Sequence, residues 1–376
     1  MSSRLPDPLF HAIEARLLHV PVRTLRAGYE ALSTDYRNRT VSEAQREDLV
    51  GLAEPVPGRA PGGFTRAQAR GLAYLAARFP ATYAAAQAAL RQVPLEALEG
   101  CRSVLDLGAG PGTATWALVE RQPGFQEATF LESEPEMLAH AQALAGTFVG
   151  LKVTVTPGDL KQRLAEAPAH DVVVMAYVLS ELDEASQTAL LSQAWAKATK
   201  GLFLLEPGTP ETSRRVLAAR DQLLKAGGHL VGPCPQEGAC PMAEPGKLDW
   251  KRINEKKEGP YWCHFSVRLE RRGLHHQVKS GVLGYEDEKY SWLYISKNPQ
   301  LGPATPYRLH ADPKRMNRHI ELKVCDKSGK RDVLFYNRRD TPQNIRNAAR
   351  RLEWGFSWDP QKVPALPLEQ DDFEAE

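Results

Sequence analysis

The sequence predicts an α/β protein with a parallel sheet at its centre, preceded by a helical region and followed by a cysteine-rich, β-rich region. Three observations support this prediction. Short apolar runs alternate with helical segments between residues 101 and 231. Alanine-rich segments with helical spacing occupy residues 1–96. After Val231, proline, glycine and cysteine cluster, and runs of alternating apolar and polar residues follow.

Residues 1–96 have the patterns of several helices. The segment Ala27 to Arg37 is followed by a capping-box pattern at Thr40 to Glu43. Thr65 can cap a further helix, which Pro80 should break or kink because proline lacks a backbone N–H. We interpret this region as a packing and docking module rather than as a catalytic one.

The central region predicts five short buried strands separated by helices, which is the pattern of βαβ units. The strands are Ser103 to Gly108, Ala128 to Ser133, Leu151 to Val155, His170 to Val178 and Gly201 to Pro207. The helices are Thr113 to Arg121, Pro135 to Ala145, Glu184 to Thr199 and Glu211 to Ala226. Beyond them, His264 to Glu270 and Lys289 to Lys297 predict antiparallel strands, and a last hairpin is predicted to turn at Ser328-Gly329.

The segment VLDLGAGPGT contains the strongest local pattern for ligand binding. Its strand ends in Asp106, and Gly108, Gly110 and Gly112 let the backbone turn sharply and approach a ligand. Nicotinamide-binding folds use a similar loop, but their spacing is G-x-G-x-x-G, whereas here an acid precedes G-x-G-x-G. The loop is therefore predicted to bind a different nucleotide-like ligand.

Two further acids follow the next two strands. Glu132 ends the second strand, and Asp159 comes just after the third. Because carboxylates only accept hydrogen bonds, they suit ribose hydroxyls and an exocyclic amine, and an acidic pocket suits a cation. On these residues, the region from about residue 100 to 230 resembles the class I S-adenosylmethionine methyltransferases.

That resemblance implies a cofactor and its binding residues. Asp106 and the glycine loop would face the methionine moiety, Glu132 the ribose and Asp159 the adenine amino group. The S-adenosylmethionine-binding residues implied are Asp106, Gly108, Ala109, Gly110, Gly112, Thr113, Glu132 and Asp159.

The sequence assigns no catalytic residue. The fourth strand ends in AYVLSEL, and the Asn-Pro-Pro-Tyr motif of amino-methylating enzymes does not occur there. Tyr177 and Glu181 are candidates for a substrate pocket, with a packing aromatic and a helix-start acid as the alternative.

Four of the five cysteines lie late in the chain. Cys234 and Cys240 lie in GPCPQEGACPM, Cys263 in YWCHF and Cys325 in KVCDK. Four thiolates from such turns match an iron–sulfur cluster or a tetrahedral zinc site. No C-x2-C pair occurs, and the wide spacing suits a cubane cluster at least as well as zinc. Unrelated structural cysteines are the third interpretation.

Three further interpretations concern Cys101, His264 and the two cysteines that precede prolines. Cys101 is interpreted as an inert core residue, and His264 as a structural histidine rather than a spare ligand. Cys234 and Cys240 precede prolines, as a nucleophile for pyrimidine methylation can. We discount that role because such a nucleophile normally lies at the end of the fourth or a later strand.

Several motifs together are more specific than the glycine loop. They are AYLAARFPATYAA, VLDLGAGPGTATWA, YVLSEL, LLEPGTP, GPCPQEGACPM, WCHFSVRLER and GYEDEKYSWLYISK. Over about residues 70–355 they are similar to the methyltransferase-like proteins of small ribosomal subunit assembly, known in mitochondria and with bacterial members. This resemblance implies a [4Fe–4S] cluster held by Cys234, Cys240, Cys263 and Cys325, with zinc as the alternative. It also implies the small ribosomal subunit and its 16S-type rRNA as partners.

One stretch departs from the expected pattern. Residues 243–261 form a long, charged segment between the second and third implied ligands. We interpret it as a surface loop whose lysines and arginines could reach rRNA. The alternative is that Cys263 is not the third ligand.

Charge is unevenly spread, although the net charge is only +2. From Arg308 to Arg351 there are thirteen lysines and arginines against five acids, and from Leu352 onward there are seven acids and one lysine. The basic segment could contact a polyanion, with Trp354 and Trp358 stacking on bases, or it could be a solvated surface. The acidic tail is expected to be disordered.

The composition excludes a membrane protein, because no run of 18 apolar residues occurs. The first residues do not have the pattern of a secretory signal. We therefore expect a bacterial cytoplasmic protein, monomeric when it is off the ribosome.

Together these patterns predict a class I (Rossmann-like) methyltransferase domain with an N-terminal helical domain and a cysteine-rich, β-rich C-terminal region. The predicted boundaries are 1–96 for the helical domain, 97–298 for the methyltransferase domain with its cysteine-rich segment at 231–265, 299–358 for the basic domain and 359–376 for the tail. The predicted function is rRNA methylation, late subunit assembly, or both. A non-catalytic assembly factor, and a small-molecule methyltransferase with a structural zinc, are the alternatives.

Overall fold

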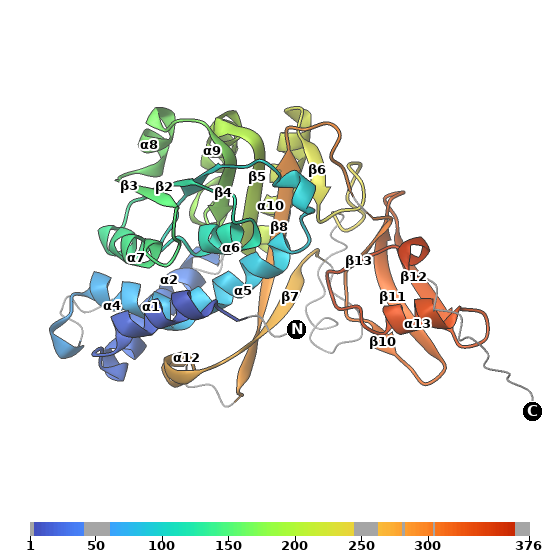
Figure 1. Ribbon diagram of the computed structural model, residues 1–376, viewed down its shortest axis with the longest axis horizontal. Helices are drawn as coiled ribbons and strands as arrows, with labels where there is room; N and C mark the ends of the chain where they lie inside the picture. The colour runs from blue at the N-terminus through green and yellow to red at the C-terminus, as the bar shows by residue number, and fades with distance from the viewer. Residues whose placement is uncertain (1–3, 41–60, 244–261, 280–282, 304, 365–376) are drawn as a thin grey trace, which may run out of the picture. The chain divides into compact units, whose positions relative to one another are not determined.

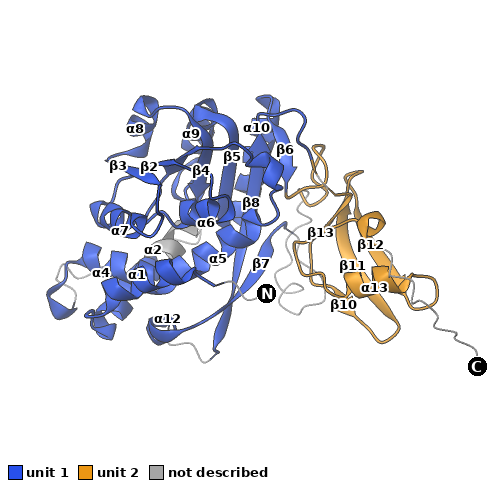
Figure 2. Cartoon of the chain, in the orientation of Figure 1, with its two compact units in different colours: residues 1–232, 262–302 blue, residues 233–261, 303–376 orange. Residues whose placement is uncertain are grey.

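The computed structural model describes residues 4–40, 61–243, 262–279, 283–303 and 305–364 (Figure 1). The chain forms two compact units (Figure 2). Unit 1 contains residues 1–232 and 262–302, and unit 2 contains residues 233–261 and 303–376. The predicted cysteine-rich segment is thus divided between the units, because residues 233–261 group with the C-terminal part of the chain.

Unit 1 is built around a sheet whose first five strands are parallel. Four of them contain runs of buried residues, and the fourth carries three consecutive valines, which favour strand geometry. The five strands are β1 (Ser103–Leu107), β2 (Glu127–Glu132), β3 (Lys152–Pro157), β4 (His170–Ala176) and β5 (Ala198–Pro207). They lie where the sequence predicts them, with ends shifted by a few residues.

Three later strands complete this sheet. They are β6 (His229–Gly232), β7 (Phe265–Glu270) and β8 (Tyr285–Ser296). The long strand β8 lies between β5 and β6 and is antiparallel to both, and β7 pairs with it. The order β3-β2-β1-β4-β5-β8-β6, with one reversed strand, is that of the class I methyltransferase fold. The predicted fold class is confirmed.

Helices cover both faces of the sheet (Figure 1). On one face α6 and α7 pack beside the N-terminal helices, and on the other α8, α9 and α10 pack side by side. Their bounds are α6 (Thr113–Arg121), α7 (Pro135–Ala145), α8 (Leu160–Glu166), α9 (Glu184–Lys197), α10 (Pro210–Lys225) and, after β7, α12 (Gly273–Lys279).

The N-terminal helices belong to unit 1. They are α1 (Asp7–Leu17), α2 (Val22–Thr40), α4 (Arg66–Ala73) and α5 (Phe79–Leu90). Thr65 caps α4 through a capping box with Gln68, as predicted. The irregularity expected at Pro80 is a π-helical turn, Tyr74–Arg78, directly before α5. Because Pro80 has no N–H to donate, widening the preceding turn lets the chain continue as a helix.

In its described residues, unit 2 contains a five-stranded sheet and one α-helix. Its elements are β9 (Tyr307–Leu309), β10 (Lys314–Arg315), β11 (His319–Asp326), β12 (Arg331–Asn337), α13 (Gln343–Ala349) and β13 (Ser357–Trp358). The hairpin between β11 and β12 turns where the sequence predicts it, with Gly329 at a φ of 80°.

Some predictions fall outside the described residues. These are most of the capping-box pattern at residues 40–43, the charged stretch at 243–261 and most of the acidic tail. Among the described helices, none is both long enough and apolar enough to cross a bilayer.

Candidate functional site

A cavity of about 270 Å³ lies in unit 1 at the carboxyl ends of β1, β2 and β4. In open α/β sheets this edge is where ligands bind. Seven of the eight residues predicted to bind a cofactor line it: Asp106, Gly108, Ala109, Gly110, Thr113, Glu132 and Asp159. Tyr177 and Glu181, the candidates for a substrate pocket, line it as well.

The glycines of the loop after β1 serve two different purposes. Gly110 has a φ of 54°, and a Cβ at this position would meet no atom within 4 Å among the described residues. Gly112, the eighth predicted residue, does not line the cavity. A Cβ there would lie 2.7–2.8 Å from the rings of Trp116 and Phe130. Gly110 therefore leaves room above the loop, whereas Gly112 permits close packing beneath it.

Asp106 lies at the cavity floor with one unsatisfied oxygen. Its side chain is almost fully buried, and Oδ2 accepts a 2.7 Å hydrogen bond from the hydroxyl of Thr115. Oδ1 has no hydrogen-bond partner among the described residues. Burial raises the pKa of Asp106 to about 7. A buried acceptor without a partner is costly, so it suits a ligand that brings a donor or a positive charge.

The carboxylate of Glu132 ties the end of β2 to the glycine loop. It accepts backbone N–H groups from Gly110 at 2.8 Å, from Ser133 at 2.7 Å and from Glu134 at 2.9 Å. An ionised carboxylate has about four acceptor positions. The Ser133 hydroxyl also donates to Oε1 at 3.3 Å, whereas Oε2 accepts only the Gly110 N–H among the described residues. Oε2 can therefore hold the loop and still accept a ligand hydroxyl.

Asp159 caps a helix at the edge of the cavity. It is the N-cap of α8, and its Oδ1 accepts hydrogen bonds from the N–H groups of Lys161 and Gln162. Its other carboxylate oxygen is not used in this cap. The cap fixes the side chain at the cavity edge, where a ligand amine could reach it.

Tyr177 follows β4 and is held in an unusual backbone conformation. Its φ is 62°, and it is the one non-glycine residue with positive φ among the described residues. Its N–H donates to Leu205 at 2.7 Å, and its hydroxyl donates to Glu288 at 3.1 Å. Glu288 also forms an ion pair with Arg78, with contacts of 2.9 and 3.3 Å. Such strain clusters at functional sites because the surroundings must enforce it.

The N-terminal helices form one wall of this cavity, which the sequence did not indicate. Leu32 of α2, Arg70 of α4, Tyr74 of the π-helical turn and Thr82 of α5 line it. Burial raises the pKa of Tyr74. The one local signal for this wall was Pro80, whose effect on the helix produces the wide turn that carries Tyr74.

Three of the four late cysteines belong to unit 2 and lie near one another. Burial, together with the neighbouring thiols of Cys234 and Cys240, raises the pKa of Cys325 to about 12. The turn of the β11–β12 hairpin lies against the same segment, because a Cβ on Gly329 would be 3.6 Å from the carbonyl of Ala239. Unit 2 therefore brings together thiols from two distant parts of the chain.

Cys263 belongs to unit 1, just before β7. Its carbonyl accepts hydrogen bonds from the hydroxyls of Ser213 at 2.8 Å and Ser291 at 3.0 Å. His264 beside it is buried and stacks on Trp262, and burial lowers its pKa to about 4. Cys101 is buried in the core, as predicted. Within the described ranges, no group of three metal-ligating side chains is already arranged around a common point.

Two side chains expected to contact RNA have other roles. Trp358 is buried in the core of unit 2, and its Nε1 donates to the hydroxyl of Tyr336 at 2.7 Å. Arg308 is also buried, and it donates to the carbonyls of Pro233 at 2.6 Å and Gly355 at 2.8 Å. The expectation that Trp358 stacks on bases is therefore wrong, because the unit needs this ring for its own core.

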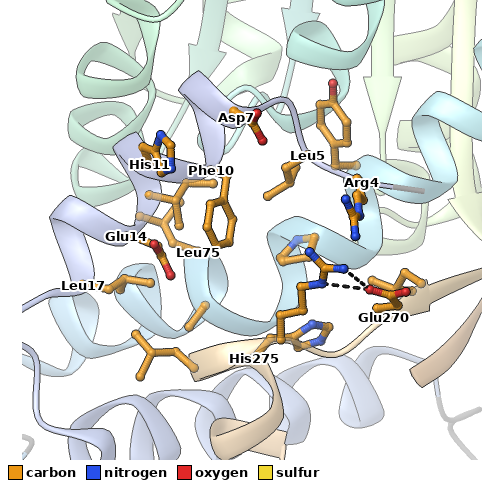
Figure 3. A pocket seen from close by; sticks show the side chains of 17 residues that line it. Arg4, Leu5, Asp7, Phe10, His11, Glu14, Leu17, Leu75, Glu270 and His275 are labelled. Carbon is orange, nitrogen blue, oxygen red and sulfur yellow. Dashed lines mark hydrogen bonds and ion pairs between the residues drawn. The ribbon is translucent and has the colours of Figure 1, made fainter. Parts of the chain in front are cut away.

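A second cavity, of about 220 Å³, lies elsewhere in unit 1 between α1, the start of α5 and the β7–α12 segment (Figure 3). Phe10, Leu17 and Leu75 line it beside the ion pair of Arg272 and Glu270. Its lining mixes apolar side chains with charges of both signs. No residue lines both cavities, but neighbours in the chain do: Tyr74 and Thr82 line the first, and Leu75 and Tyr83 line the second.

Sequence comparison connects the chain with ribosomal proteins. A family model described as mitochondrial small ribosomal subunit Rsm22 matches residues 68–359. That range contains every residue that lines the first cavity except Leu32, all four late cysteines and the sheet of unit 2. The human protein named ribosome assembly protein METTL17, mitochondrial, is 25% identical over 301 residues. The match covers 76% of this chain and 61% of the human protein, so the chain spans less than two thirds of that relative's length.

The solved structures to which the chain is similar include methyltransferases. An O-methyltransferase family protein from Burkholderia thailandensis is 18% identical, with 54% of this chain and 65% of that chain covered and a TM-score of 0.38. A magnesium protoporphyrin IX methyltransferase from Synechocystis, solved with bound S-adenosylmethionine, is 12% identical. There 71% of this chain and 96% of that chain are covered, with a TM-score of 0.35. At such identities the similarity describes the fold alone.

Proposed function

Because the chain belongs to the Rsm22 family of mitochondrial small ribosomal subunit proteins, we propose that it binds S-adenosylmethionine and acts in the assembly of the small ribosomal subunit. The family match over residues 68–359 is the observation that carries this proposal. The name of the human relative points in the same direction, since it describes a ribosome assembly protein.

The lining of the first cavity supports S-adenosylmethionine as the ligand. The unpaired Oδ1 of Asp106 would accept the ammonium group of the methionine part. The open space above Gly110 would admit the ligand against bare backbone. Glu132 and Asp159 would accept the ribose hydroxyls and the adenine amine. The bound cofactor would supply an activated methyl group.

The donor chemistry of the late cysteines supports a metal centre held by Cys234, Cys240, Cys263 and Cys325. Neighbouring thiols disfavour one another's ionisation, and a bound cation removes that repulsion. We propose a [4Fe–4S] cluster, with zinc as the alternative. Iron and sulfide analysis after anaerobic purification distinguishes them, since zinc without sulfide would overturn the cluster.

A second candidate function is methyl transfer to 16S-type rRNA. The observation that favours it is Tyr177, whose strained backbone and buried hydroxyl lie on the wall of the same cavity. Methyl transfer would place the acceptor atom of the rRNA beside this wall. The Tyr177 phenol, held by Glu288, would orient that acceptor and would not itself be the base, because burial raises its pKa well above the ordinary value.

The test combines cofactor binding, subunit binding and methyl transfer. Purified, fully metallated protein should bind S-adenosylmethionine in calorimetry and sediment with immature small subunits. Tritium from labelled cofactor is then sought in the rRNA. Incorporation that Asp106→Ala abolishes supports methyl transfer, whereas binding without incorporation supports a non-catalytic assembly factor. A protein that binds neither the cofactor nor the subunit would refute the proposal.

A further inference from the structure

One face of the unit 2 sheet is covered by the apolar core of the unit, and the opposite face, called the open face below, is exposed along β12. On the covered face, alternate residues of β11, namely Ile320, Leu322 and Val324, are fully buried. They pack with Ala349 of α13 and with Trp358. Because strand residues alternate between faces, His319, Glu321, Lys323 and Cys325 point to the other side.

The open face exposes an aromatic ring and an aliphatic side chain. Phe335 of β12 is 61% exposed, and Val333 is 38% exposed. The strand register places Phe335 opposite Glu321 and Val333 opposite Lys323. His319 lies beside Phe335, with ring centroids 6.1 Å apart. Exposed apolar side chains on neighbouring positions of a strand favour association, so this pair is a candidate contact for a partner.

The charges on this face favour a polyanion as that partner. Within the described strands β10, β11 and β12, the basic side chains on this face are Lys314, Lys323 and Arg331, and the one acid is Glu321. Glu321 is already paired with Lys314 at 3.4 Å and with His319 at 3.1 Å. Within the described part of the chain, Lys323 and Arg331 have no carboxylate partner. The face therefore carries positive charge that it does not neutralise.

We propose that this open face, formed by His319, Lys323, Arg331, Val333 and Phe335, binds single-stranded RNA, an inference that rests on the proposed function. Unpaired bases stack on exposed aromatic rings, and adjacent cations contact the phosphates. A base-paired A-form helix does not offer unstacked bases to such a surface. Phe335 serves as the stacking platform. Lys323, opposite Val333, and Arg331, two residues before Val333 on β12, contact the backbone.

The test measures binding of full-length, metallated protein to a labelled, unstructured RNA oligonucleotide by fluorescence anisotropy. Phe335→Ala should raise the Kd about tenfold, which lies within the range for loss of one stacked base. The double variant Lys323→Ala/Arg331→Ala should reduce the slope of log Kd against log salt by about 1.4, since each lost phosphate contact contributes about 0.7.

Two matched controls lie in the same unit but off this face. Phe356 is 40% exposed, and Phe356→Ala should leave the Kd unchanged within about twofold. Lys362 is 70% exposed in its side chain and precedes Val363, which packs on the α13 side. Lys362→Ala should leave the salt slope unchanged. Equal losses in the control and face variants would overturn the proposal.

Further outcomes separate this proposal from its premise. If wild-type protein sediments with immature subunits and Phe335→Ala does so equally well, the face is not the RNA surface, whereas the assembly function stands. If wild-type protein does not sediment with subunits, the assembly function itself is wrong. If Phe335→Ala dissociates a dimer and leaves the RNA affinity unchanged, the face binds a second copy of this chain instead.

Discussion

At the scale of single residues, the buried acid Asp106 has the most testable chemistry. Its burial and its unpaired Oδ1 keep it partly protonated near neutral pH, unlike an ordinary aspartate. A cationic ligand favours the ionised form, so ligand binding and proton release are coupled.

The affinity for S-adenosylmethionine should therefore depend on pH. Below the pKa of about 7, a proton must leave Asp106 before it can pair with the ligand. We expect the association constant, measured by calorimetry, to rise by up to about tenfold per pH unit below that pKa and to level off above it. Asp106→Asn should weaken binding and remove this pH dependence.

Glu206 provides the control for that experiment. It is fully buried, burial raises its pKa to about 7 as well, and it does not line the cavity. Its Oε1 accepts the N–H of Leu179 at 2.7 Å. Glu206→Gln should keep the pH dependence of binding. If the pH dependence were instead lost in Glu206→Gln and kept in Asp106→Asn, the titrating proton would belong to Glu206 and not to Asp106.

The same two acids should affect the stability of the ligand-free protein. Their pKa values in the folded state lie above the ordinary carboxyl range, so the folded protein retains protons that the unfolded chain releases. Their contribution is fully present below about pH 4 and is lost as the pH rises through about 7. The double variant Asp106→Asn/Glu206→Gln should show a smaller fall in free energy of unfolding between these values, measured by urea denaturation.

Two glycines of the loop should respond differently to the same substitution. Gly110→Ala introduces strain of about 1–2 kcal/mol from its positive φ, but no clash, and its methyl group enters the cavity. Gly112→Ala adds a clash with Trp116 and Phe130, for a total loss of about 2–5 kcal/mol. Thermal unfolding and calorimetry together should show lost binding in the first variant and lost stability in the second. Equal destabilisation by both would contradict this assignment.

At the scale of elements, the strands β4 and β8 and the π-helical turn meet at the Tyr177–Glu288–Arg78 contact. The side chains of Arg78 and Glu288 are 18% and 14% exposed. Glu288 accepts hydrogen bonds from both Tyr177 and Arg78. The strained turn at the cavity wall is thus supported by an ion pair from outside the cavity.

Breaking this ion pair should loosen the wall. Glu288→Gln leaves Arg78 with a poorly compensated charge, and we expect a loss of about 2–3 kcal/mol, moderated by the remaining solvent contact. Asp287→Asn, next to it, breaks an exposed pair with Arg268 and should change stability by less than about 1 kcal/mol. Differential scanning calorimetry measures both, and similar melting temperatures for the two variants would refute the supporting role of Glu288.

The elements that could be predicted from the sequence are those whose signal is local. The three valines of β4, the glycine loop after β1 and the capping box at Thr65 each carry their information within a few residues. The Tyr177–Glu288 contact joins residues 111 positions apart and has no local pattern. Likewise, the alanine-rich helical pattern of the N-terminal region predicts a packing and docking module. That pattern does not reveal that Tyr74 lines the cavity.

At the scale of the whole molecule, the family and the fold class were both predicted correctly, because the motifs that carry them extend along most of the chain. The role of Trp358 was predicted wrongly, because an aromatic residue in a basic segment has the same sequence pattern whether its ring is buried or exposed. The division of the cysteine-rich segment between two units was also not visible, because it depends on contacts of residues 233–243 with the distant β11–β12 hairpin.

Loss of the proposed metal centre should affect unit 2 more than unit 1. Three of the four proposed ligands belong to unit 2, whose core is a small cluster of apolar residues. Below a certain core size, metal binding contributes much of the folding free energy. We expect chelator-treated protein to be cleaved rapidly by protease within residues 305–350, while residues 101–232 remain protected.

The control for this experiment is a cysteine outside the proposed site. Cys101→Ala should retain iron and the protease resistance of the untreated protein, whereas Cys325→Ala should lose both. Identical digestion patterns with and without metal would show that unit 2 is stable on its own.

The chain passes from unit 1 to unit 2 after residue 232, returns at residue 262 and leaves again after residue 302. Strand β8, which fills the gap between β5 and β6, is therefore translated after the first segment of unit 2. During synthesis the polypeptide leaves the exit tunnel from its N-terminus, so Cys234 and Cys240 emerge long before Cys325. The four proposed ligands are therefore all present only after Cys325 has emerged, so the proposed metal site can be completed only late in synthesis.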